Sequence, residues 1–110
     1  MKNQLFGAGI WHFATYVDRY NTDGYGEPRS VLDAIELAGK VKDLSVVDIN
    51  FPYFGGNFTN EEIKASLEKV NLNVIGITPE IYTKEFRKGA FTNPDPGIRN
   101  RAHELITEAC

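Results

Sequence analysis

The chain has only one cysteine, Cys110, among its 110 residues. A lone cysteine excludes an internal disulfide and a zinc site built from several cysteines, so we expect a reducing, cytoplasmic location. No apolar run approaches the roughly 20 residues that a membrane-spanning helix needs. The first four residues make a poor secretory signal, and we therefore expect no membrane partner.

The chain also lacks a strong excess of charge of either sign. Twelve Lys and Arg stand against fifteen Asp and Glu, for a formal net charge of −3, and they are scattered along the chain. Neither a nucleic-acid footprint nor a polybasic membrane patch is indicated. Hydrophobic residues make up 42% and charged residues 25% of the chain, which is typical of a globular protein. Residues 1–110 are predicted to form one domain, with no second.

Several catalytic motifs are absent from the sequence as well. There is no Gly-x-Gly-x-x-Gly ahead of a helix, no Walker-type loop and no Gly-x-Ser-x-Gly elbow. His12 and His103 are far apart, and no group of carboxylates and imidazoles has the spacing of a divalent-metal site. We therefore expect no catalytic residue and no metal ligand set in this chain.

Three short apolar runs, each followed by a loop and an amphipathic stretch, divide the chain. They are residues 5–13, 44–51 and 72–78. Each is nearly continuous in apolar character at its centre, which is typical of parallel strands buried on both faces. A half-exposed antiparallel strand would alternate instead. The sequence therefore predicts three buried parallel strands.

Helix-start signals follow each run. Ser30 with Asp33, and Thr59 with Glu62, have the spacing of capping boxes, and Asp95 can cap a helix whose first residue is a proline. Apolar residues at helical spacing follow each cap and predict the buried stripes. These are Val31, Ala34, Ile35, Ala38 and Val41, then Ile63, Leu67 and Val70, and finally Ile98, Ala102, Leu105, Ile106 and Ala109.

Alternating strands and helices with short links favour an α/β fold of right-handed parallel βαβ units. Three such units take roughly 95 of the about 250 residues of a closed (β/α)₈ barrel. The last predicted helix reaches Cys110 without a closing glycine, and three parallel strands leave open edges. We expect a partial TIM barrel made of its first three units. The alternative is a small α/β domain whose third helix is terminal.

The active site of such a barrel lies at the carboxyl ends of its strands. There the loops mix aromatic residues with hydrogen-bonding groups, the combination that binds sugars. The residues are Trp11, His12, Phe13, Tyr16, Asp18, Arg19 and Tyr20 after the first run, Asp48, Asn50, Phe51, Pro52, Tyr53 and Phe54 at the second, and Pro79, Glu80, Tyr82, Lys84 and Phe86 after the third. Four of them are our predicted substrate-binding residues: Trp11, His12, Asn50 and Glu80.

Each of these residues also has a structural interpretation. Trp11 is either a pocket wall or a core side chain, and His12 is either a polar contact to substrate or a structural hydrogen-bonding group. Asp48 and Asn50 are two residues apart and share a face of their strand, where Asp48 either faces the barrel interior or pairs with a neighbouring strand. Glu80 either orients a substrate hydroxyl or is a solvated loop carboxylate.

Two segments resemble xylose isomerases. Residues 6–11, Phe-Gly-Ala-Gly-Ile-Trp, are similar to the opening strand of that family, which ends in a substrate-pocket tryptophan. Residues 86–99, FRKGAFTNPDPGIR, are similar to the family's Phe-x-x-Gly-Gly-Phe-Thr stretch, which precedes an Asp and an Arg at the start of the third helix. The resemblance spans nearly all of this chain and implies that it corresponds to the first third of the family's barrel, with Trp11 in the pocket.

The resemblance implies an aldose–ketose isomerase or a related sugar epimerase. Such enzymes hold one or two divalent cations (Mg²⁺, Mn²⁺ or Co²⁺) that polarise the sugar while hydrogen moves between C1 and C2. Their ligands come from later strands, beyond Cys110, so the resemblance implies that this chain binds no metal and is inactive alone. Its implied partners are a small-molecule sugar and either the rest of the barrel or another copy of the chain.

One position departs from the family. In xylose isomerases the second strand ends with a histidine that assists opening of the sugar ring, and Asn50 stands nearest to that place. Asparagine can hydrogen-bond to a ring oxygen but cannot transfer a proton at neutral pH. We therefore expect a divergent relative that acts on another sugar or sugar acid.

Two other functions remain as alternatives. The related endonuclease family uses the same barrel for phosphodiester cleavage, but the acidic balance and the absence of basic loops argue against it. The non-enzymatic alternative is a carbohydrate-binding or assembly module built from βα units. Such a module would be a well-folded monomer or a defined dimer, whereas a partial barrel would self-associate through its open strand edges.

Overall fold

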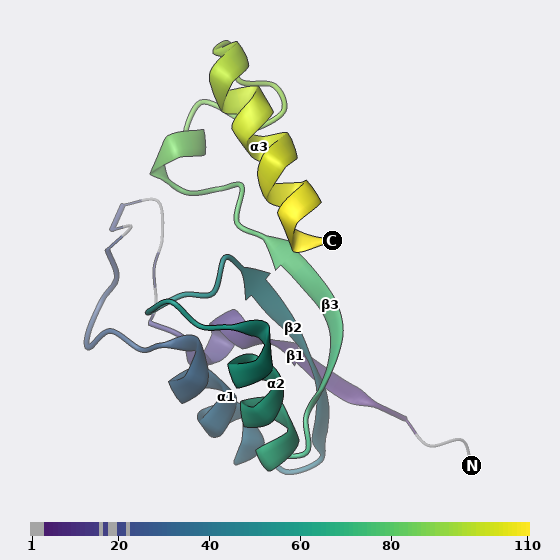
Figure 1. Cartoon of the computed structure of the whole chain (residues 1–110). Coiled ribbons are helices and arrows are strands. Elements are labelled where there is room, and N and C mark those ends of the chain that lie inside the picture. Colours follow the sequence, from purple (N-terminus) through teal and green to yellow (C-terminus); the bar gives the residue numbers. More distant parts are fainter. Residues whose placement is uncertain (1–3, 16, 18–19, 22) are drawn as a thin grey trace.

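The computed structural model describes residues 4–15, 17, 20–21 and 23–110. Within them strands and helices alternate, and one parallel sheet has the order β1-β2-β3 (Figure 1). The elements are β1 (Phe6–Gly9), the 3₁₀ helix η1 (Ile10–Phe13), α1 (Val31–Gly39), β2 (Leu44–Phe51), α2 (Asn60–Lys69), β3 (Asn73–Pro79), the 3₁₀ helix η2 (Lys84–Phe86) and α3 (Pro96–Ala109). The predicted α/β class with parallel βα units is confirmed.

The three α-helices begin where the sequence predicts. Ser30 and Asp33 form a reciprocal capping box before α1, and Thr59 and Glu62 form another before α2. The carboxylate of Asp95 accepts a backbone N–H at 2.8 Å and caps α3. Each cap satisfies N–H groups that have no partner within their helix, so the sequence sets these starts locally.

The main hydrophobic core lies between the sheet and the helices α1 and α2, which cover the same face (Figure 1). Val47 and Ile49 contribute to it from β2, where they point to one side because alternate residues of a strand share a face. The buried members are Ile10, Val31, Ala34, Ile35, Ala38, Val47, Ile49, Ile63, Leu67 and Leu72. Most of the predicted helix stripes are therefore confirmed.

Val41 is an exception to the predicted stripe of the first helix. α1 ends at Gly39, and Val41 lies exposed in the turn that follows. A Cβ on Gly39 would come within 2.6 Å of Val70, so the absence of a side chain there lets the end of α1 approach the end of α2. Val41 is exposed because it lies beyond the last residue of α1.

The first strand is shorter than predicted. The ladder with β2 ends at Gly9, and Ile10–Phe13 form a 3₁₀ turn within the stretch predicted as strand. Local hydrogen bonds take over there: the backbone N–H of Ala14 donates to the carbonyl of Trp11 at 3.2 Å. The apolar character of this stretch reflects burial of Ile10 in the core, which a turn satisfies as well as a strand does.

The third strand is not buried on both faces, contrary to the prediction. β3 pairs with β2 along its length, but Val74, Ile75 and Ile77 are exposed, and Ile75 keeps 68% of its accessible surface. The helices α1 and α2 cover the part of the sheet around β2 instead. The continuous apolar run therefore predicted the strand correctly, but the prediction that this strand is buried on both faces was wrong.

Helix α3 lies beyond the carboxyl end of β3 and is not packed beside α2 (Figure 1). Its buried residues, Ala102 and Leu105, form a second, smaller core with Phe86 of η2. Phe51 and Ile81 pack against this cluster from the ends of β2 and the loop after β3. The third βα unit is thus joined to the rest mainly at the carboxyl edge of the sheet.

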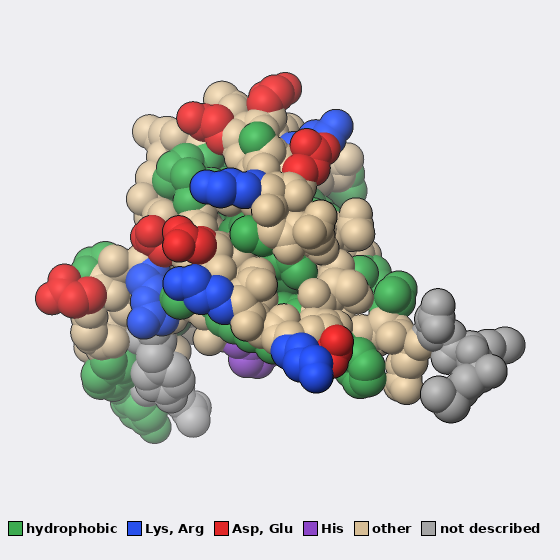
Figure 2. Space-filling model, turned by 90° about the horizontal axis from the view of Figure 1, so that it is seen from below, with side chains coloured by type: hydrophobic (Ala, Val, Ile, Leu, Met, Phe, Trp, Pro, Cys, Tyr) green, Lys and Arg blue, Asp and Glu red, His purple; other side chains and the backbone are tan. Residues whose placement is uncertain are grey.

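Side chains of opposite charge are interspersed on the surface. In the face shown in Figure 2, Lys and Arg alternate with Asp and Glu and do not gather by sign. None of the described helices is both long and apolar enough to cross a bilayer.

Candidate functional site

The candidate site lies on the face of the sheet opposite α1 and α2. Asp48 and Asn50 point to this face because they alternate along β2 with the core residues Val47 and Ile49. Parallel pairing places Asp48 between Gly9 of β1 and Gly76 of β3, and Asn50 beside Thr78. We call Asp48, Asn50, Thr78, Glu80 and Tyr82 the rim site, since they gather at the carboxyl end of β2 and β3.

Glycines on both neighbouring strands leave room around Asp48. A Cβ on Gly76 would lie 2.7 Å from a carboxylate oxygen of Asp48. A Cβ on Gly9 would overlap the indole ring of Trp11. The indole therefore lies against the backbone of Gly9 on the same face as Asp48, and it remains 42% exposed. Trp11 therefore borders the rim site and is absent from the buried core.

Two side-chain hydrogen bonds join the strands at the rim site. The hydroxyl of Thr78 donates to Asp48 at 2.7 Å, which confirms that Asp48 pairs with a polar group of the neighbouring strand. The amide nitrogen of Asn50 donates to the phenol oxygen of Tyr82 at 2.9 Å. Asn50 is only 1% exposed, yet its amide oxygen has no hydrogen-bond partner among the described residues. A buried acceptor left in this way is costly, which marks the position as one that a ligand could satisfy.

Burial raises the pKa of two residues of the rim site, Glu80 and Tyr82. Burial raises the pKa of Glu80, because a charged carboxylate loses hydration there. The backbone N–H of Glu80 donates to the carbonyl of Phe51 at 2.8 Å and holds the residue against the end of β2. Burial also raises the pKa of Tyr82, and the negative charge of Glu80 adds to that effect. Tyr82 therefore remains a phenol that can both donate and accept.

The structure brings two of the four predicted site residues, Asn50 and Glu80, into one cluster. Trp11 borders that cluster across Gly9. His12 follows Trp11 in η1, and its Nδ1 lies 3.0 Å from the carbonyl oxygen of Gly9. This contact joins His12 to the residue that precedes its own 3₁₀ helix.

Thr78 was missed as a site residue, and Tyr82 was named in the loop after the third run but not among the four predicted substrate-binding residues. Thr78 could have been found from period two, since it follows Gly76 on the face that bears Asp48. Strand periodicity could not place Tyr82, because β3 ends at Pro79 and Tyr82 lies in the loop that follows. Tyr16, Asp18 and Arg19, which the sequence placed in the first rim loop, lie outside the described residues.

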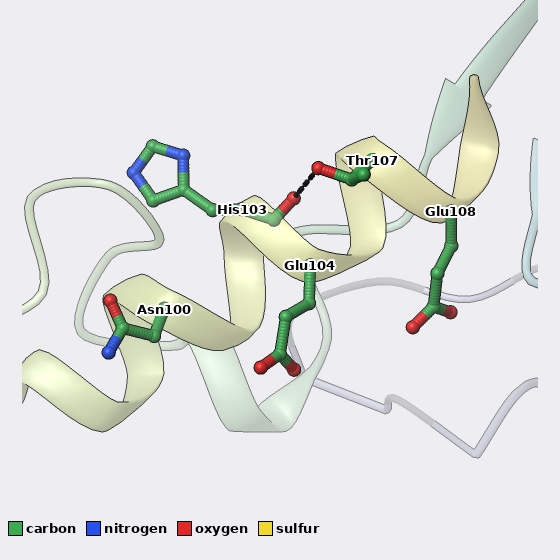
Figure 3. Close-up of a pocket in the computed structure, with 5 residues that line it drawn as sticks. All are labelled: Asn100, His103, Glu104, Thr107 and Glu108. Carbon is green, nitrogen blue, oxygen red and sulfur yellow. Dashed lines mark hydrogen bonds between the residues drawn. The ribbon is translucent and has the colours of Figure 1, made fainter.

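Two hollows elsewhere on the surface do not include the rim site. One lies along α3, where Thr107 donates a hydrogen bond to the carbonyl of His103 at 2.9 Å. Figure 3 shows the imidazole of His103 projecting away from the carboxylates of Glu104 and Glu108, so these groups do not converge on a ligand. The other lies in the loop from β2 to α2 and includes Tyr53. Neither combines converging polar groups with a buried unpartnered atom.

No three His, Cys, Asp or Glu side chains within the described part of the chain are placed to hold a metal ion. The divalent cation implied by the resemblance to xylose isomerases therefore does not fit these residues, and no step through a metal follows from them. No family model and no curated protein sequence matches the chain. The functional argument consequently depends on the geometry of the site.

Proposed function

We propose that this chain forms the first three βα units of a barrel of the sugar isomerase or epimerase type, and that its own contribution is to bind and orient the sugar. The consecutive strand order β1-β2-β3, with α1 and α2 on one face, supports this proposal. A singly wound barrel has that arrangement, whereas a doubly wound sheet reverses direction and carries helices on both faces. The proposed site is at the carboxyl end of the strands, as barrels require.

The observation that carries the proposal is the buried amide of Asn50 with one unpartnered polar atom. Around it stand the carboxylates of Asp48 and Glu80 and the hydroxyl groups of Thr78 and Tyr82. These groups match the adjacent hydroxyls of a sugar, each of which donates and accepts. The exposed indole of Trp11 offers a flat apolar surface for the C–H face of the ring.

Hydrogen transfer is not assigned to these residues. The metal ligands of such an isomerase would come from other parts of a completed barrel, supplied by the remaining units or by another copy of the chain. In this proposal the chain works in the cytoplasm, and residues 1–110 bind the sugar without turning it over.

Trp11 provides the test, because it is the only tryptophan in the chain and borders the rim site. Its fluorescence is followed while D-xylose, D-fructose or xylitol is added to wild type, Asn50→Ala and Asn100→Ala. Asn100 is an exposed residue of α3 and serves as the matched control. We expect a saturable change in wild type and Asn100→Ala, and its loss in Asn50→Ala with an unchanged circular dichroism spectrum.

A wild-type protein that is folded and shows no saturable response to any of these ligands would overturn the proposal. The same conclusion follows if Asn50→Ala binds as well as wild type. Turnover of a sugar by residues 1–110 without added metal would contradict the assignment of binding alone.

The second candidate function is an assembly module, and the exposed apolar residues of β3 favour it. Val74, Ile75 and Ile77 are large apolar residues left in contact with solvent, and β3 has an unpaired edge in the described sheet. Such an edge is a template for pairing with another strand. A defined dimer in analytical ultracentrifugation, together with no response to sugars, would favour this candidate over the first.

A further inference from the structure

The two partners of the Asn50–Tyr82 hydrogen bond differ sharply in exposure. Asn50 is 1% exposed and sits on the central strand, whereas Tyr82 is 62% exposed in the turn after β3. A ligand reaches the Asn50 amide only when a neighbouring side chain moves away. Tyr82 is bonded to that amide and is mostly exposed, so its side chain has solvent to move into.

The hydrogen bonds of the Asn50 amide also indicate that Tyr82 gives way to a ligand. A phenol can donate or accept, so Tyr82 could bond equally to the oxygen or to the nitrogen of the amide. In either rotation of the amide, Tyr82 satisfies one polar atom and the other keeps no partner among the described residues. The free protein therefore uses half of a site that a ligand with two adjacent hydroxyl groups fills completely.

We propose that Tyr82 occupies, in the free protein, the position on Asn50 that a ligand hydroxyl takes in the complex, so that an uncharged polyhydroxyl ligand binds by displacing the Tyr82 side chain. This inference rests on the proposed function, because it names how the sugar enters the rim site. The exchange conserves hydrogen bonding, since a sugar hydroxyl donates and accepts as a phenol does.

The surrounding charges define the class of ligand. Among the residues that the structure describes, the ionisable side chains whose charge acts on Tyr82 are the acids Glu80 and Asp48. Their negative charge disfavours a phosphate or a carboxylate at the same place. The rim site therefore selects a neutral sugar or polyol over a phosphorylated sugar or a sugar acid.

The test is the affinity of Tyr82→Phe, which keeps the ring and removes the competing hydroxyl. Because the ligand no longer displaces an existing hydrogen bond, we expect its Kd to fall about fivefold, equivalent to about 1 kcal/mol. Tyr53→Phe is the matched control, since the Tyr53 hydroxyl donates to Asn60 at 2.7 Å in the loop between β2 and α2. Its Kd should equal that of wild type.

Ligand binding is measured with xylitol and D-xylose by Trp11 fluorescence and by saturation-transfer NMR. D-Xylose 5-phosphate tests the ligand class. A lower Kd in Tyr82→Phe and weaker binding of the phosphate support the inference. A Kd that is unchanged or raised in Tyr82→Phe, while wild type binds, overturns the displacement and leaves the proposed function standing. Tighter binding of the phosphate overturns the ligand class, and absence of binding by both proteins overturns the proposed function with the inference.

Discussion

The first two βα units and the third unit differ in packing, although their helices begin by similar signals. α1 and α2 share one core with β2, in which Ile35, Val47 and Ile49 are almost fully buried. α3 rests on a small cluster around Phe86 and Leu105 at the end of the sheet. The strand of the third unit has an exposed face, whereas the strand of the second has none of its large apolar residues exposed.

This difference shows that helix caps decide where a helix starts and not where it docks. Ser30, Thr59 and Asp95 all cap their helices through side-chain oxygens. Caps contribute about 1 kcal/mol each, which is small beside the burial of several large apolar side chains. Docking is therefore set by tertiary burial, and the third unit has less of it.

The largest expected effect on stability comes from truncating a large apolar side chain to alanine, which we compare between the two cores. Ile35→Ala should lower the free energy of unfolding by about 2–5 kcal/mol, because it empties space in the shared core. Leu105→Ala should loosen α3 and leave the unfolding of the first two units nearly unchanged. Urea denaturation followed by circular dichroism, with hydrogen exchange of α1 and α3 amides, measures both effects.

Ile75→Ala is the control for this comparison, since Ile75 is exposed on β3. Its free energy of unfolding should match that of wild type within about 0.5 kcal/mol. Equal global losses in Ile35→Ala and Leu105→Ala would show that the third unit belongs to the same cooperative core, and the comparison would fail.

Much of the fold could be predicted from the sequence because its signals are local. The capping boxes at Ser30 and Thr59 and the full extent of β2 follow from nearest neighbours along the chain. The exposed face of β3 and the position of α3 could not be predicted, since they depend on what covers the sheet. The 3₁₀ turn after Gly9 was missed because apolar periodicity records burial and not backbone geometry.

Some features of the candidate site could likewise be predicted from the sequence, and others could not. Asn50 and Asp48 could be placed on one face by period two, and Glu80 by its position after a strand. The bond from Asn50 to Tyr82 joins residues 32 apart and has no local signal. The unpartnered atom of Asn50 is likewise a property of the packed sheet and not of the sequence around it.

The second prediction compares two caps. Thr59→Ala should lower the free energy of unfolding by about 1 kcal/mol, because α2 belongs to the shared core and fraying at its start weakens the whole unit. Asp95→Ala removes a similar bond but should increase hydrogen exchange only in the first turn of α3. Ser66→Ala, within α2, is the control and should not destabilise. A global loss in Asp95→Ala as large as in Thr59→Ala would contradict the separation of the two regions.

The third prediction uses the exposed face of β3. Ile75→Lys should change the free energy of unfolding by less than about 0.5 kcal/mol, because the side chain is already in solvent. It should reduce concentration-dependent self-association, since a charge on an edge strand opposes pairing with another strand. Sedimentation velocity over a range of protein concentrations measures this. Asn100→Lys adds the same charge on α3 and should leave association unchanged, and equal association in both variants would exclude β3 as the contact.

The smallest effects are the opposite pH dependences of two carboxyl groups. Hydrogen bonds from Ser30, that from its backbone N–H being the stronger, lower the pKa of Asp33 below its ordinary value of 3.8, so its contribution to stability is present above that pH and is lost as the pH falls further. Burial raises the pKa of Glu80 above its ordinary value of 4.5, so the contribution of its protonated form is present below that pH and is lost as the pH rises through the raised pKa.

Glu80→Gln should therefore be more stable than wild type at neutral pH and lose that advantage below about pH 4.5. Asp33→Asn should be less stable at neutral pH and approach wild type on acidification. Thermal melts of both variants from neutral to acid pH give the two slopes of stability against pH. Slopes of the same sign would show that the pKa values of Glu80 and Asp33 are not shifted in opposite directions.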